Sequence, residues 1–421
     1  MIFSLDLRRA RKGDCLILHY GTKGDPGLML IDGGPSQVYG PQLKPRLARI
    51  RAARGLADKD QLPVDLLMVS HIDDDHINGI LELTGELVDA KDAKQTLPID
   101  IRSFWYNTFD DIIGNDPAEL LAAVTAQFGP ASLAGEPDTE GLNPDAAKVL
   151  ASVDQGIRLR DDARKLKLRL NPAFDGKLVM AAKGAKALDL EKGLSLTVAG
   201  PMKAELAALQ KSYNAFLKEK AKKKPKAAVA SFTDTSVPNL SSIVAIAGAG
   251  GKRVLLTGDA RGDKILQGLE LTGALKAKGT LHVDVLKMPH HGSDRNMEVS
   301  FLNRITADHY VFSGNGEHGN PERATLEMLR QARGDQSAYE IHLTYPIADI
   351  DVEREKDWKK EQQKEKVRKK KDSKIVVRAN WSPKVNSLTA FFAAHTAFAK
   401  KVTIVESGKP HVIDLLDPLG F

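Results

Sequence analysis

The sequence predicts an α/β protein with a polar site at the ends of several buried strands. Apolar runs of strand length alternate with longer helical segments along much of the chain. Two of these runs lead into histidine, because residues 64–70 precede His71 and residues 283–288 precede His290. A third run ends in the carboxylate of Asp259. Since open α/β sheets bind ligands at the carboxyl ends of their strands, these side chains indicate a functional site.

Length and composition set broad limits. With 421 residues, of which 42% are hydrophobic, the chain can form one large domain with insertions or two ordinary domains. It has no apolar run long enough to cross a membrane and no start resembling a signal peptide, so we expect a cytoplasmic protein without membrane contact. The single cysteine, Cys15, lies in an apolar run and predicts a buried, inert thiol.

The chain opens with three predicted strands, at residues 2–7, 14–20 and 28–31. Asp32 follows the third strand, and the two glycines after it allow the backbone to turn sharply. Such a turn would bring the Asp32 carboxylate toward the edge of the sheet. A plain surface turn explains the same three residues equally well.

Residues 70–80 are the stretch richest in metal-binding side chains. A basic amphipathic helix is predicted over residues 41–57, and the buried strand over 64–70 leads into the stretch. Its two imidazoles and two carboxylates suffice for two neighbouring divalent cations, and they belong to His71, Asp73, Asp75 and His76. A helix over residues 77–87 follows directly, and the N-terminus of a helix adds positive potential.

The middle of the chain is less regular. Residues 99–106 predict a strand that ends at Asn107. Over residues 109–190, alanine-rich charged segments are broken by Gly-Pro and Asn-Pro pairs, which predicts an inserted helical cap; a pair of surface helices is the alternative. A strand resumes at 194–201, and residues 239–259 predict a hairpin that ends in Asp259.

The next predicted strand contains Lys287 and leads into His290 and His291. The end of a core strand would bury only one of two adjacent histidines, so a structural role explains half of this pair at best. Beyond it we expect a strand over residues 310–313 and a helix over 321–333, followed by a strand over 340–345.

The net charge of +6 comes from 61 basic and 55 acidic residues, which indicates a mixed surface with local basic excess. The excess lies in residues 218–226 and 352–374. In the second run glutamates alternate with lysines, which predicts a charged helix supported by ion pairs one turn apart. Contact with nucleic-acid phosphates is the competing interpretation. Residues 383–421 are expected to form closing strands that return to the sheet.

Several of these motifs together resemble one superfamily. The pattern His-x-Asp-x-Asp-His at 71–76, Leu-Ile-Asp-Gly-Gly at 30–34 and Leu-Leu-Thr-Gly-Asp at 255–259 are similar to motifs of the metallo-β-lactamase-fold hydrolases. The string Met-Pro-His-His-Gly-Ser at 288–293 resembles their competence-type branch, which includes the hydrolase domain of the DNA-uptake channel ComEC. The resemblance covers the motifs from residue 2 to about 345, and the insertion at 109–190 and the tail from 352 lie outside it. It implies a four-layer αββα sandwich with a dinuclear site between two sheets, and we expect one domain over residues 1–421.

The resemblance also implies roles for individual residues. One cation would bind Asp75, His76, Asp259 and His291, and the other would bind His71, Asp73 and the shared Asp259. Asp32, Asn107 and Lys287 would support these ligands. Relatives often carry a further histidine after the strand that here ends at Asn107, yet there is no histidine between His76 and His282. The second position is therefore short of nitrogen donors. Carboxylate-rich sites of this kind lean toward Mn²⁺ or Mg²⁺ more than Zn²⁺, so the two expected ions are Zn²⁺ or Mn²⁺, with the second site weak or empty as an alternative.

The implied activity is hydrolysis by a metal-activated water. Asp75 and His290 would be catalytic, with His290 as an acid or a phosphate contact, although His290 and His291 could exchange roles. An anionic substrate is expected, and a phosphodiester or nucleic acid is favoured. The alternatives are a lactonase, thioesterase or β-lactamase of the same fold, and a nucleic-acid- or protein-binding module with a depleted site.

Overall fold

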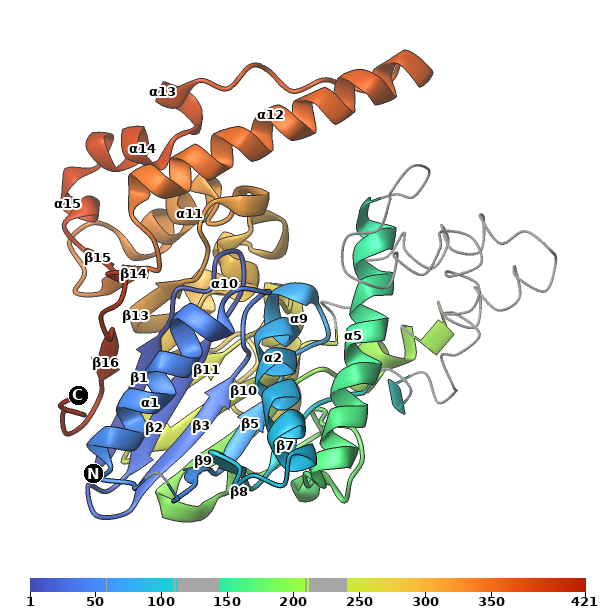
Figure 1. Ribbon diagram of the computed structural model, residues 1–421. Coiled ribbons are helices and arrows are strands. Elements are labelled where there is room, and N and C mark those ends of the chain that lie inside the picture. The colour runs from blue at the N-terminus through green and yellow to red at the C-terminus, as the bar shows by residue number, and fades with distance from the viewer. Residues whose placement is uncertain (58, 109–110, 113–143, 209, 212–240) are drawn as a thin grey trace.

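The computed structural model describes residues 1–57, 59–108, 111–112, 144–208, 210–211 and 241–421. They form a mixed α/β protein with two large sheets (Figure 1). The first sheet has the strand order β16-β1-β2-β3-β5-β7. Its strands are β1 (Ile2–Leu7), β2 (Leu16–Gly21), β3 (Pro26–Ile31), β5 (Leu66–Met68), β7 (Phe104–Trp105) and β16 (Val412–Asp414).

The second sheet has the order β15-β14-β13-β12-β11-β10-β9-β8, and the pairs from β11 to β15 are parallel. Its strands are β8 (Leu188–Asp189), β9 (Ser195–Gly200), β10 (Val244–Ala249), β11 (Lys252–Leu256), β12 (Leu281–Lys287), β13 (Ile305–Phe312), β14 (Glu340–Leu343) and β15 (Val402–Ile404). A small additional sheet pairs β4 (Leu62–Val64) with β6 (Ile99–Ile101).

Helices connect and cover these strands. The α-helices are α1 (Lys44–Ala53), α2 (Asp74–Asp92), α5 (Pro144–Leu166), α9 (Gly262–Thr272), α10 (Val299–Arg304), α11 (Arg323–Arg333), α12 (Ile347–Lys371), α13 (Pro383–Asn386), α14 (Leu388–Ala394) and α15 (Thr396–Ala399). The short turns are η1 (Tyr39–Leu43), η3 (Pro172–Phe174), η4 (Glu191–Gly193), η5 (Pro289–Gly292), η6 (Asp294–Asn296) and η7 (Glu317–Gly319). None of the helices in the described ranges combines the length and the apolarity that a membrane span requires.

The strands bury both of their faces. Along β5, Leu66 and Met68 belong to a core cluster that also contains residues of β9 to β12, whereas Leu67 belongs to a cluster with α1 and α2. On the second sheet, Leu255 and Leu286 pack into a third cluster with α9, α10 and α11. Because successive side chains of a strand point to opposite faces, such strands carry apolar residues throughout. Polar chemistry is then left to the strand ends.

Several element boundaries differ from the sequence-based prediction. The strand expected over 64–70 is two short strands, β4 and β5, which lie in different sheets. The strand expected over 99–106 is likewise divided between β6 and β7. The helix expected from residue 77 begins already at Asp74. Asp74 and Asp75 are favourable in the first turn of a helix because their negative charges interact well with the positive end of its dipole. The metal-binding stretch at 71–76 and the first turn of α2 therefore overlap.

Only part of the predicted insertion over 109–190 lies within the described residues, since 113–143 are outside them. Helix α5 packs along α2, where Thr84 Oγ1 donates to Asp162 at 2.7 Å. The basic run at 218–226 also lies outside the described residues. The run at 352–374 falls on α12, which spans Ile347–Lys371.

The expectation of closing strands over 383–421 needs correction. Residues 383–399 are helical in α13, α14 and α15, and only β15 and β16 are strands. Ser387 caps α14 by accepting a hydrogen bond from the backbone of Ala390. Phe391 and Phe398 are fully buried in the same cluster as α9 to α11. This stretch therefore joins the helical layer over the second sheet before the chain reaches β16 in the first.

Candidate metal centre

Five segments that are distant in the sequence meet where the central strands end. They are the N-terminal turn of α2 after β5, the turn after β11 that carries Asp259, the η5 turn after β12, the residues just before β2, and the residue that follows β13. The carboxyl ends of β11, β12 and β13 are neighbours because these strands pair in parallel. Their end residues can therefore converge on one place.

The backbone at this place is unusual. His290 and His291 both have left-handed φ values, of 46° and 55°, and Asp32 has a φ of 56°. Non-glycine residues rarely adopt this conformation, and each costs on the order of 1 kcal/mol or more. Two consecutive histidines held in it are positioned by the surrounding structure rather than by local preference. Strain of this kind is characteristic of functional sites.

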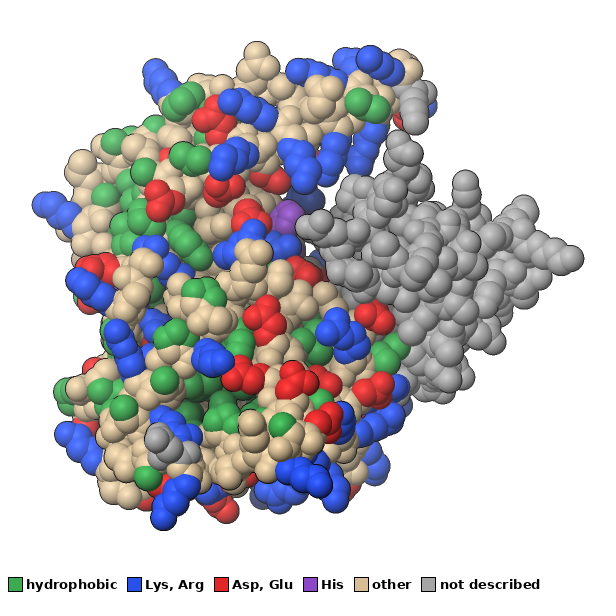
Figure 2. Space-filling model, viewed as in Figure 1, with side chains coloured by type: hydrophobic (Ala, Val, Ile, Leu, Met, Phe, Trp, Pro, Cys, Tyr) green, Lys and Arg blue, Asp and Glu red, His purple; other side chains and the backbone are tan. Residues whose placement is uncertain are grey.

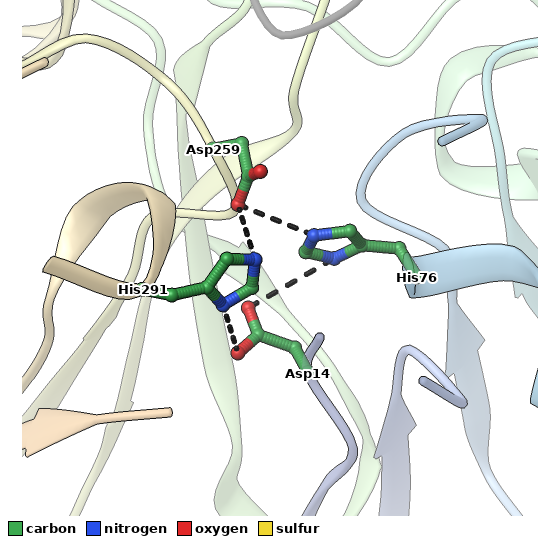
Figure 3. Close-up of side chains that lie close together, drawn as sticks. All are labelled: Asp14, His76, Asp259 and His291. Atoms are coloured by element: carbon green, nitrogen blue, oxygen red, sulfur yellow. Dashed lines mark ion pairs between the residues drawn. The ribbon is translucent and has the colours of Figure 1, made fainter. Parts of the chain in front are cut away.

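The centre of the site is a buried group of two imidazoles and two carboxylates. Asp14, His76, Asp259 and His291 each offer a ligand atom, and all four atoms lie within 4.8 Å of one another. Figure 3 shows His76 and His291 both directed at Asp259, with Asp14 on their other side. The Nε2 atoms of His76 and His291 lie 3.2 and 3.4 Å from Asp259 Oδ1. Asp75 Oδ2 is 3.7 Å from His291 Nε2.

The second oxygen of Asp259 faces a different pair of histidines. His71 Nε2 lies 3.8 Å from Asp259 Oδ2, and His290 Nε2 lies 3.6 Å from it. Asp73 Oδ2 is 3.8 Å from His71 Nε2. The two oxygens of one carboxylate thus divide four histidines and two further aspartates into two sets.

The inward-facing nitrogens suit a cation. The Nε2 atoms of His71, His76 and His291 are buried, and no hydrogen bond to a described residue satisfies them. Buried polar atoms without a hydrogen bond are rare in proteins. Neutral imidazole nitrogens and carboxylate oxygens are, however, the usual ligands of zinc and related divalent ions. The residues present therefore fit a divalent metal ion beside Asp259.

The opposite nitrogens hold the rings in place. His76 Nδ1 lies 2.8 Å from Asp32 Oδ2, and Asp32 also accepts hydrogen bonds from the backbone and hydroxyl of Ser70, both at 2.7 Å. Ser70 Oγ is 3.1 Å from His71 Nδ1. Ser313 Oγ is 3.0 Å from His291 Nδ1. Each ring is thereby oriented with its Nε2 toward Asp259, as ligating histidines require.

Asp14 and Lys287 form a buried ion pair beside the centre. Lys287 Nζ contacts Asp14 Oδ2, and both side chains are almost completely buried. The hydroxyl of Ser313 donates to Asp14, which also lies 3.4 Å from His291 Nδ1. Asp14 thus faces the outer nitrogen of His291 and supports that ring. No local sequence pattern marks Asp14, although Lys287, a predicted site residue, requires a carboxylate partner once it is buried.

The predicted site residue Asn107 and the neighbouring aspartate of the motif at 71–76, Asp74, have other partners. Both polar groups of the Asn107 side chain bond the backbone of Val179, at 2.7 and 2.8 Å, so the amide fastens the segment before β8 rather than a histidine. Asp74 bonds Asn78 and Lys12 and points away from Asp259. Lys12 comes from the loop before β2 and lies close enough to Asp75 for this carboxylate to raise its pKa, against the effect of burial.

Charge coupling in the centre is strong. Burial raises the pKa of Asp75, but the charges of His76, His291 and Lys12 outweigh burial and lower this pKa to about 2. Burial lowers the pKa of His291, but Asp259 and Asp14 raise it to about 9. Burial and His76 together lower the pKa of His71 to about 3. Protons on His76 and His291 thus balance the carboxylates, and a divalent cation would replace them.

Comparison with known proteins does not place the chain in a family. No family model matches it. Microtubule-associated protein 1A from Homo sapiens and from Mus musculus is 34% identical over 88 residues, which is 20% of this chain and only 3% of either relative. A crystal structure from Parabacteroides distasonis ATCC 8503, provisionally named a metal-dependent hydrolase, aligns over 80% of this chain and 97% of its own. Its TM-score of 0.30 and identity of 9% are too low to support a conclusion.

Proposed function

We propose that the protein is a metal-dependent hydrolase of the metallo-β-lactamase type that uses two divalent ions bridged by Asp259. One observation carries this proposal: each carboxylate oxygen of Asp259 faces its own pair of histidine Nε2 atoms. A single-ion site would need only one such pair. Two metal ions that share one bridging carboxylate require this two-sided arrangement.

The packing of the sheets supports a four-layer sandwich. One core cluster joins residues of the first sheet to residues of the second. The other two clusters join the outer faces of the sheets to α1 and α2 on one side and to α9, α10 and α11 on the other. The molecule would then consist of a helical layer, the first sheet, the second sheet and another helical layer, with Asp259 at the carboxyl ends of the strands.

The proposed ligand sets revise the role of His290. The first ion would bind Asp75, His76, His291 and Asp259 Oδ1, and the second would bind His71, Asp73, His290 and Asp259 Oδ2. In this assignment His290 is a ligand rather than an acid, and the second position gains the imidazole that it lacked in the sequence-based assignment. Both ions then have two nitrogen and two carboxylate donors, a set that suits Zn²⁺ or Mn²⁺.

The bound ions would supply a water molecule of lowered pKa and would polarise the bond to be cleaved. The chain's own residues determine where a substrate can enter. Asp73 and His290 are the more open side of the centre, with 25% and 26% of their side chains exposed, whereas His71 and His76 are fully enclosed. Lys12 lies beside Asp75 and would present its ammonium group to an anionic substrate.

A phosphodiester is the substrate class we favour, because Lys12 places a positive charge next to the ligands. Nucleic acid is a narrower version of this proposal. Figure 2 shows lysine and arginine side chains along α12. Several of them are paired with glutamate, as in Lys356–Glu353 and Lys359–Glu355, both at 2.6 Å. This pairing weakens the case for a phosphate-binding arm and leaves a small phosphodiester as the better substrate.

The test is metal analysis combined with hydrolysis of a small chromogenic phosphodiester. We expect Asp259→Asn to lose both central ions and to lower hydrolysis by at least about 10³-fold, since the bridging ligand is removed. The matched control is Asp89→Asn, an exposed aspartate further along helix α2. Unchanged metal content in Asp259→Asn would refute the bridge. If the protein binds metal and hydrolyses a lactone or a thioester but not the phosphodiester, the substrate class would be a lactone or thioester instead.

Salt dependence separates the nucleic-acid version from the small-substrate version. If α12 guides a polyanion, oligonucleotide binding should weaken steeply with salt, because each phosphate contact releases counterions. Replacing Lys360, Lys369 and Lys370 by glutamine would then flatten that slope without changing hydrolysis of the small substrate. Binding that is absent at low ionic strength would restrict the proposal to small phosphodiesters.

A further inference from the structure

A second group of histidines lies on β13 and β14, outside the Asp259 centre. These strands pair in parallel, with His309 opposite Glu340 and Val311 opposite His342. Alternate residues of a strand share a face, so Glu340 and His342 project from the same side of β14. The ligand atoms of His309, Glu340 and His342 all lie within 4.8 Å of one another. Two neighbouring strands thus bring two imidazoles and a carboxylate together.

The separations are those that one metal ion would impose. His309 Nδ1 lies 3.1 Å from His342 Nε2. Glu340 Oε2 lies 3.7 Å from His309 Nδ1 and 3.6 Å from His342 Nε2. Two ligands of a tetrahedral zinc ion, each about 2.0–2.2 Å from the metal, stand about 3.3–3.6 Å apart. The three observed distances lie close to this value.

The surroundings favour ligation over a plain ion pair. His342 is buried, and its Nδ1 lies 2.9 Å from His411 Nε2, which orients the ring with Nε2 toward Glu340. The side chains of His309 and Glu340 are 23% and 55% exposed. An ion can therefore enter from solvent, and a water molecule can complete its coordination.

We propose that His309, Glu340 and His342 bind one divalent transition-metal ion, with Zn²⁺ the best match to two imidazoles and one carboxylate. The ion would bridge β13 and β14 of the second sheet. Through His342 and His411 it would also reach the first sheet, because His411 directly precedes β16. Its role would be to fasten the two sheets at this edge. This site is independent of Asp259 and of the hydrolysis proposed there.

The experiment uses equilibrium dialysis of the full-length chain against Zn²⁺ alone. In Asp259→Asn, which disables the central site, we expect about one equivalent of Zn²⁺ to remain. Adding His309→Gln should remove this equivalent or weaken its binding at least about 100-fold, as expected for loss of a ligand. The matched control is His282→Gln, because His282 is an exposed histidine on the adjacent strand β12 that bonds Thr306. It should leave Zn²⁺ binding unchanged.

A second variant guards against misfolding. Glu340→Gln alters a side chain that is mostly exposed. In the otherwise unchanged chain it should remove one equivalent of bound Zn²⁺ or weaken the binding of that equivalent. Zn²⁺ should also raise the Tm of Asp259→Asn by a few degrees, and this rise should vanish with His309→Gln. In the otherwise unchanged chain, His309→Gln should leave phosphodiester hydrolysis intact. Full Zn²⁺ content in both His309→Gln and Glu340→Gln would overturn the proposal and leave a hydrogen bond between two imidazoles.

Discussion

The two histidine groups of this protein differ in how firmly their rings are held. Around Asp259, His71, His76 and His291 are buried and each has its outer nitrogen engaged by a serine or an aspartate. On β13 and β14, only His342 is held in this way, while His309 and Glu340 are partly exposed. Firm orientation of several ligands is what catalysis demands. The looser group needs only to bind an ion, and we assign it a structural role for this reason.

The groups also differ in charge. Around Asp259 the carboxylates are buried with the histidines, and the pKa of His291 is raised to about 9. At the sheet edge the pKa values of both His309 and His342 are lowered by burial. A cation must therefore displace protons from His76 and His291 at the centre, where the pKa of His71 is lowered as at the edge. Imidazole clustering alone therefore does not define a site, because the buried carboxylates decide what the cluster does.

The largest effect on stability is expected from the ion pair behind the centre. Lys287→Met removes the ammonium partner of the buried Asp14 carboxylate and leaves it only its contacts with Ser313 and the histidines, which should lower the free energy of unfolding by up to about 3–5 kcal/mol. Denaturant unfolding measures this loss. The double variant Lys287→Met with Asp14→Asn should recover part of it. An equal loss for both variants would show that Asp14 is stabilised without Lys287.

The next effect separates the two central ions. His290→Ala should remove one of the two ions and lower hydrolysis at least about 10²-fold, because it takes a nitrogen from the second position only. His291→Ala should remove the other. Metal content per chain and initial rates measure both variants. Full metal content in His290→Ala with lost turnover would return His290 to the acid role and leave the second ion poorly held.

A smaller effect is expected from Asp32, which touches the ring of His76 rather than the ion. Asp32→Asn should weaken metal binding at the centre by about 10–100-fold, because the ring loses its carboxylate partner. Zn²⁺ binding at the sheet edge should stay unchanged and serves as the internal control. Competition with a chromogenic chelator measures both affinities. Equal weakening at both sites would point to general unfolding instead.

The smallest effect concerns His19, a buried histidine outside both groups. Its pKa is lowered by burial despite Asp6, while Arg46 and Arg54 lower it further. Below about pH 6.5, His19 therefore takes up a proton in the unfolded chain more readily than in the folded chain. The contribution of the neutral ring to the free energy of unfolding is complete above that pH and is lost as the pH falls. His19→Gln should flatten the fall in unfolding free energy as the pH drops below about 6.5, without changing metal content. An unaltered profile would assign the fall to other groups.

The central part of the site could be predicted because its signals are local. A buried strand followed directly by His71, Asp73, Asp75 and His76 is visible in eleven consecutive residues. Asp259 and the pair His290–His291 stand at strand ends in the same way. Hydrophobic runs bury both faces of a strand, so polar residues that remain at its end belong to a sheet edge. The sequence alone thus determined the α/β class and most of the side chains of the centre.

Only the tertiary structure decided how these side chains divide. That His290 faces one oxygen of Asp259 and His291 the other depends on left-handed backbone at both histidines, which no local pattern indicates. The partnership of Asp14 with Lys287 joins residues far apart in the chain. The group of His309, Glu340 and His342 exists only because β13 and β14 pair in one register. A shift of one residue would turn Glu340 and His342 to the opposite face, and strand register is set by the packing of the whole sheet.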